Sequence, residues 1–153
     1  MPAPILERWL AAAVAVYGGL LAQQAAVERD PFRNPVGHAL RRNLGVVLRE
    51  FRGGMDASAI DTAFADIMSL RSIQDLSVDR AVGFVFSLRD IARDEFPQME
   101  AADIEARVDR LALSAFRQYL GCRERLATLQ LNEQLRALGV ARRRAAHDGG
   151  AVA

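Results

Sequence analysis

Two histidines and a short polar cluster are the side chains of this chain best suited to ligand binding or proton transfer. His38 follows Asn34-Pro35-Val36-Gly37 and could ligate a haem iron or change charge near neutral pH. The alternative, which we favour, is a helix-start histidine whose ring bonds to a neighbouring backbone or carboxylate group. His147 lies near the C-terminus, and we expect no function for it.

The polar cluster lies between two expected helices and contains Arg71, Gln74, Asp75 and Ser77. Arg71 with Gln74 could grip an anion or a signalling partner, because arginine presents a rigid fork of donors. The alternative is a structured turn, in which Asp75 and Ser77 satisfy free backbone N–H groups and Arg71 pairs with Asp75. If it is buried, the cluster would also fix how the two helices meet.

The other polar residues do not suggest a catalytic or metal site. Two histidines leave too little for a nucleophile, a base and an orienting group, and helical carboxylates with nearby arginines favour solvated ion pairs. The single cysteine, Cys122, excludes an intrachain disulfide or a Cys-rich zinc site and is typical of a reducing compartment. We therefore expect a cytoplasmic protein that is not an enzyme and holds no metal or cofactor, with haem on His38 as the alternative.

Length and composition indicate one soluble domain. The chain has 153 residues, of which 51% are hydrophobic and 25% charged. Its 20 basic residues, all arginine, are balanced by 19 acidic ones. A nucleic-acid partner would favour a basic surplus gathered on one face, so we expect none.

Residues 9–22 form an uncharged run that could be mistaken for a targeting or membrane segment. It is shorter than the ~20 apolar residues that span a bilayer. Glu7 beside Arg8 is unlike the basic start of a signal peptide, although the small residues after position 21 leave export open as an alternative. We expect an amphipathic helix here, bent near Gly18-Gly19.

Hydrophobic residues recur at steps of three and four along the rest of the chain, and no stretch alternates long enough for a strand. The sequence therefore predicts an all-α fold. The second helix begins at Pro35 with Asn34 as its cap and ends at Gly53-Gly54. A third follows Asp56 or Ser58, and a fourth, apolar on most sides, runs from Ser77 to Pro97. Gly83 lies inside the fourth helix, where another backbone could approach closely.

The region from residue 103 to about 144 lacks proline, and its glycines are Gly121 and Gly139. It predicts one long helix, or two broken near Gly121. Its near-heptad seam could pair with a second copy or pack into the chain's own core, and both can hold on different turns. The seam residues are Ile104, Val108, Leu111, Ala115, Tyr119, Cys122, Leu126 and Leu129. We expect residues 1–144 to form a single domain and 145–153 a disordered tail.

Several short motifs occur in a characteristic order and spacing over residues 5–138. They resemble the N-terminal domain of RsbRD-type RsbT co-antagonists. The motifs are ERW at 7–9, DPFRNPVGH at 30–38, RSIQDLS at 71–77, AVGFVF at 81–86, AFRQY at 115–119, CRE at 122–124 and NE at 132–133.

This resemblance implies an input domain of bacterial stress signalling, of the kind found in stressosomes. It implies a globin-like architecture of about five to seven helices that has lost haem, a dimer, and a final helix that leads to a STAS output domain. No STAS sequence follows here, so we expect a stand-alone homodimer that binds a small apolar ligand or a regulatory protein. The alternative is a haem-binding globin that senses gas or redox state through His38. The candidate binding residues are Asn34, His38, Arg71, Gln74, Asp75 and Tyr119.

Overall fold

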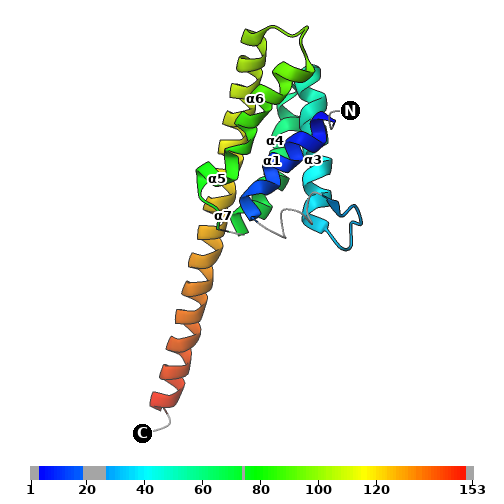
Figure 1. Ribbon diagram of the computed structural model, residues 1–153. Helices are drawn as coiled ribbons and strands as arrows, with labels where there is room; N and C mark the ends of the chain where they lie inside the picture. Colours follow the sequence, from blue (N-terminus) through cyan, green and yellow to red (C-terminus); the bar gives the residue numbers. More distant parts are fainter. Residues whose placement is uncertain (1–3, 19–26, 74, 151–153) are drawn as a thin grey trace. The chain divides into compact units, whose positions relative to one another are not determined.

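The computed structural model describes residues 4–18, 27–73 and 75–150 (Figure 1). Every regular element among these residues is a helix, which confirms the all-α prediction. The elements are α1 (Ile5–Val14), the 3-10 helix η1 (Ala15–Tyr17), α3 (Pro35–Arg52), α4 (Ala57–Ile73), α5 (Val78–Val82), α6 (Phe84–Glu95) and α7 (Ala101–Gly150).

The chain divides into two compact units, Met1–Cys122 and Arg123–Ala153, which we call the first and the second unit. The first unit contains α1 to α6 and the beginning of α7, and the second contains the rest of α7. In the first unit α1 lies against both α3 and α6, and α3 lies against α4 (Figure 1).

The core of the first unit is built from the apolar stripes that the helical period predicts. Its largest fully buried apolar side chains come from every long helix of the unit. They are Trp9, Leu10, Leu40, Leu44, Phe51, Phe64, Ile67, Met68, Leu88, Ile104 and Leu111.

Helix α3 begins and ends where the sequence indicates. The Asn34 side chain accepts a hydrogen bond from the Gly37 amide at 2.8 Å, with Pro35 in the first turn. At the other end, Arg107 of α7 donates to the carbonyls of Phe51 and Gly53 at 2.9 and 3.0 Å. The last carbonyls of a helix have no N–H partner within the helix, and Arg107 supplies one here. Arg107 therefore also fixes α7 against α3.

Helix α4 is capped by Asp56, one of the two residues expected for that role. Its carboxylate accepts from the Ala59 amide at 3.2 Å. The departure from helix expected near Gly18-Gly19 is found at Gly18, which follows η1 and adopts φ +66°. The expected continuation to residue 21 lies outside the described residues.

The fourth helix is divided, where the sequence predicts one continuous helix. The break falls at Gly83, between α5 and α6. A Cβ added at Gly83 would lie 2.5 Å from the Asp79 carbonyl oxygen, which is closer than real Cβ atoms approach. The close approach expected at this glycine is thus made by the preceding turn of its own chain.

Helix α7 is continuous through Gly121. Of the two alternatives that the sequence left open, one long helix is therefore found, and not two helices broken near Gly121. Its seam residues from Ile104 to Cys122 are buried in the core of the first unit. The helix includes residues 145–150, which we expected in a disordered tail; Ala145 and Ala146 have high helix propensity and no proline intervenes. Disorder of this tail in solution stays a prediction. None of the described helices is long and apolar enough to span a bilayer.

Candidate functional site

Among the described residues of the first unit, Arg71 is the charged side chain that the fold buries completely. It stands near the C-terminal end of α4, and its Nη2 donates to the Ala13 carbonyl of α1 at 2.5 Å. Its Nε and Nη1 are buried without a hydrogen-bond partner. Burial lowers the pKa of the guanidinium, because removal from water penalises the charged form.

Two aromatic rings stack on this guanidinium. Its carbon lies 4.7 Å from the centre of the Phe84 ring and 5.6 Å from that of Tyr17. Trp9 packs against Phe84 at 5.8 Å between ring centres and donates from Nε1 to the Phe84 carbonyl at 3.0 Å. Arg71 therefore lies in an aromatic cluster where α1, η1, α4 and the start of α6 meet.

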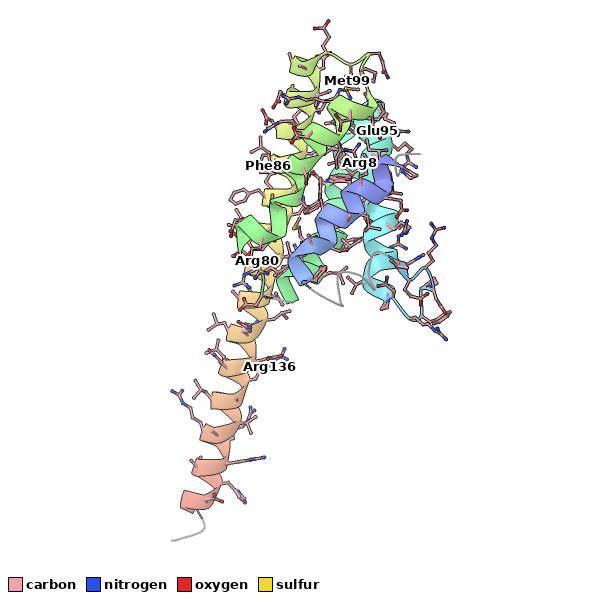
Figure 2. All side chains as sticks on the ribbon, in the orientation of Figure 1. Arg8, Arg80, Phe86, Glu95, Met99 and Arg136 are labelled. Carbon is pink, nitrogen blue, oxygen red and sulfur yellow. The ribbon has the colours of Figure 1, made fainter. Side chains whose placement is uncertain are left out.

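The motif at residues 7–9 is explained by contacts that hold α1 in place. Arg8 pairs with Glu95 at 3.2 Å (Figure 2) and with Asp94 at 2.9 Å. Glu7 pairs with Arg41 of α3. The hydrogen bond that Arg8 donates to the Asp94 carboxylate is the main cause of a raised pKa at Arg8. With Trp9, the motif joins α1 to both α3 and α6, so its role here is positional.

Two of the expected binding residues lie at the start of α3 and are not among the contacts of Arg71 described above. Asn34 is buried and fully used as a cap, because its Nδ2 also donates to the Glu28 carbonyl at 2.9 Å. His38 is exposed one turn further on. The structure therefore assigns Asn34 to the helix start and leaves the His38 ring at the surface.

Asp75 and Ser77 of the polar cluster lie between α4 and α5. Gln74 lies outside the described residues. Asp75 is exposed with φ +54°, and the described ion pairs do not join it to Arg71. The expected Arg71–Asp75 pair is therefore not the arrangement found, because the guanidinium points into the core and the carboxylate stays at the surface.

Tyr119, the last of the expected residues, is buried and donates from its hydroxyl to the Leu76 carbonyl at 2.7 Å. This bond fixes α7 to the turn that precedes α5. Leu76 lies five residues after Arg71, which stands two residues before the end of α4. The geometry indicates a positioning role for Tyr119.

An apolar groove between α5, α6 and the start of α7 was not expected from the sequence. Its volume is about 710 Å³. Phe86 and Leu113 on its walls are 46% and 64% exposed, and Phe86 points outward from α6 (Figure 2). The signal was present in Phe86, which departs from the buried stripe of its helix. The lining residues are Val78, Asp79, Val82, Gly83, Phe86, Asp109, Ala112, Leu113 and Phe116.

The second unit offers a different surface. From Arg123 on, nearly every described residue of α7 is exposed, including five large apolar ones. Between them lie polar residues such as Arg136 (Figure 2). The apolar residues are Leu129, Leu131, Leu135, Leu138 and Val140.

The described residues contain no group of three or more His, Cys, Asp or Glu side chains arranged to hold a metal ion. Their polar contacts are caps, ion pairs and bonds between helices. Fold and contacts thus define an all-helical domain whose distinctive features are a buried cation and exposed apolar surfaces.

Comparison with known families assigns this domain more closely. The family model described as "RsbT co-antagonist protein rsbRD N-terminal domain" matches residues 3–134. The chain belongs to this family of stress-signalling co-antagonist domains. Searches of curated proteins and of solved structures gave no match.

Proposed function

We propose that this chain is a non-catalytic cytoplasmic signalling domain that works as a homodimer and responds to a ligand or a regulatory protein. Family membership supports the signalling role. The observation that carries the homodimer is the exposed apolar surface of α5, α6 and α7. Globin-like architecture stays a prediction of the resemblance.

In the first unit, this surface combines the groove with the outward side of α7. Leu113, Phe116 and Leu120 are exposed at steps of three and four, so they share one face of the helix. An apolar patch of this kind, bordered here by Asp79 and Asp109, is typical of an interaction site.

In the second unit, Leu131, Leu135 and Leu138 repeat the same spacing of three and four. A helix without tertiary contacts is only marginally stable in water, and most helical stability comes from packing an apolar face. A second copy supplies the same apolar spacing. Two equivalent faces are self-complementary, as a two-fold dimer requires.

The proposed face differs from the seam that the sequence singles out. The seam residues up to Cys122 are used inside the core of the first unit. The dimer therefore rests on a neighbouring stripe of the same helix, starting at Leu113, which leaves the core packing intact.

We propose that the domain works without haem. A haem ligand needs a histidine that faces a cavity able to enclose the porphyrin. His38 is exposed, and it does not line the groove described above. An absorbance spectrum of protein purified from haem-supplied cells tests this: we expect no Soret band, and a band lost in His38→Ala would overturn it.

The dimer is tested by light scattering coupled to size-exclusion chromatography, with native mass spectrometry. We expect the wild-type chain at twice the monomer mass and Phe116→Asp at the monomer mass, because a buried carboxylate would oppose the interface. Phe32→Asp is the matched control: Phe32 is 96% exposed and is not among the residues that line the groove. A monomeric wild type at micromolar concentration, or equal effects of both substitutions, would contradict the proposal.

A further inference from the structure

The buried guanidinium of Arg71 has two nitrogens without a hydrogen-bond partner among the described residues of the first unit. Its side chain has no exposed surface, and one of its three nitrogens, Nη2, has an acceptor. Nε and Nη1 have none among the described residues. Burying donors and a charge in this way is unfavourable unless something compensates them.

The chain offers no acidic partner to Arg71. None of the described carboxylates pairs with it, and Asp75, the acidic residue closest in sequence, is exposed. The residues outside the description (1–3, 19–26, 74 and 151–153) include no Asp or Glu. No carboxylate side chain of this chain therefore compensates the charge of Arg71.

The aromatic rings do not replace that charge. Phe84 and Tyr17 cover the guanidinium plane, and stacking interacts with the faces of the group. Its N–H bonds lie in the plane and still need acceptors. Deprotonation of Arg71 does not remove the buried charge either, because arginine stays charged in proteins.

We propose that Arg71 anchors a binding site for a small monocarboxylate with an apolar or aromatic body. One carboxylate balances one guanidinium, and its two oxygens accept from a donor fork. Phosphate carries more charge and more acceptor oxygens than one arginine can match. The rings of Trp9, Tyr17 and Phe84 suit an apolar body beside the carboxylate.

The position of Arg71 gives such a ligand a structural effect. The guanidinium contacts α1 through Ala13, η1 through Tyr17 and the first turn of α6 through Phe84. Tyr17 is half-buried, so the site lies one side chain below the surface. Phe86, two residues after Phe84 on α6, lines the groove of the proposed dimer face. This inference thus deepens the proposed function by giving a ligand class.

Benzoate is a suitable probe, with benzamide as its uncharged counterpart and chloride and phosphate as inorganic anions. We expect benzoate to shift the Nε–Hε signal of Arg71 in a saturable way, read by ¹H–¹⁵N spectroscopy of the full chain. At about 100 times its Kd, benzoate should raise the unfolding midpoint by roughly 5–10 °C. Benzamide, chloride and phosphate should leave both readouts unchanged.

Two arginine variants separate the site from general charge. Arg71→Met should abolish the benzoate response while retaining the helical fold, because an unbranched apolar side chain replaces an uncompensated buried charge. Arg80→Met is the matched control and should keep the response. Arg80 also donates to a carbonyl of the same region, Val16 at 2.9 Å, but it is exposed.

Three outcomes would overturn the inference. One is an Arg71 Nε–Hε signal that does not shift with benzoate or with two further carboxylates, hexanoate and acetate. This result would mean that the chain itself supplies the acceptors. Another is an equal response to chloride, and the third is an equal response in Arg71→Met. If that variant does not fold, the wild-type signal alone decides. The oligomeric state is measured separately, so failure of ligand binding and failure of the homodimer are distinguishable.

Discussion

Helix α7 runs through two different environments along its 50 residues. In the first unit its inward side chains, such as Val108, Leu111 and Ala115, are fully buried against the other helices. In the second unit four of its leucines, Leu131 and Leu135 among them, are more than half exposed. Similar apolar spacing thus serves a core in one region and a surface in the other.

The contrast shows that apolar periodicity alone does not reveal what covers a helix. Up to Cys122, one stripe of α7 is covered by the chain, while Leu113 and Phe116 on a neighbouring stripe are not. Helicity of the first part is secured by tertiary packing. Helicity of the second part depends on local propensity and, on our proposal, on a second copy.

The largest effect that tests this contrast is expected from Leu111→Ala. Leu111 is fully buried, so its truncation leaves a cavity and should cost about 2–5 kcal/mol of unfolding free energy. Leu131→Ala, the matched change in the second unit, should stay within roughly 0.5 kcal/mol when both substitutions are made in the monomeric Phe116→Asp background. Urea unfolding followed by the fluorescence of Trp9, the single tryptophan, measures both. Equal losses in the two variants would remove the distinction between the regions.

Most of the fold could be predicted from the sequence because its signals are local. Asn34-Pro35 at the start of α3, Gly53 after its end and the apolar steps of three and four act within a few residues. The break at Gly83 could not be predicted, because it depends on how closely the Asp79 carbonyl approaches. That distance is set by backbone geometry and not by residue type.

A glycine pair provides the next largest effect. Gly83→Ala should destabilise the first unit by about 1–3 kcal/mol, since its Cβ would meet the Asp79 backbone oxygen at 2.5 Å. Gly45→Ala, inside α3 with no atom within 4 Å of its added Cβ, should instead stabilise by about 0.5–1 kcal/mol. The same fluorescence-detected unfolding measures both, and a stabilised Gly83→Ala would show that the break tolerates a side chain.

The candidate site was predictable only in part. Arg71 stands out in the sequence as a donor within a polar cluster, and the structure places it in the core. Its aromatic partners, Tyr17 and Phe84, lie 54 and 13 residues away along the chain, so no local pattern could connect them. His38 attracted attention by its chemistry, but exposure is a property of the tertiary fold.

A smaller effect is expected where α7 is fixed to the turn before α5. Tyr119→Phe removes the hydroxyl that donates to the Leu76 carbonyl and should cost about 1 kcal/mol. The ring stays, so the apolar packing is retained. We expect unchanged helicity by circular dichroism and a lower urea midpoint. No change in the midpoint would mean that water satisfies the Leu76 carbonyl equally well, and that this junction resembles the exposed second unit.

The smallest effect concerns Asp79, a fully exposed carboxylate of the first unit. Its contribution to stability should be as small as that of the exposed side chains of the second unit. The Ser77 hydroxyl donates to it and is the main cause of a pKa held below its usual value. A depressed pKa stabilises the fold above the usual pKa, and this contribution is lost as the pH falls through the folded-state value. Ser77→Ala should therefore raise the pKa of Asp79, and the difference in stability between variant and wild type should vanish at low pH. Carboxyl-carbon titration by NMR measures the pKa; an unchanged value would assign the shift to the backbone amides.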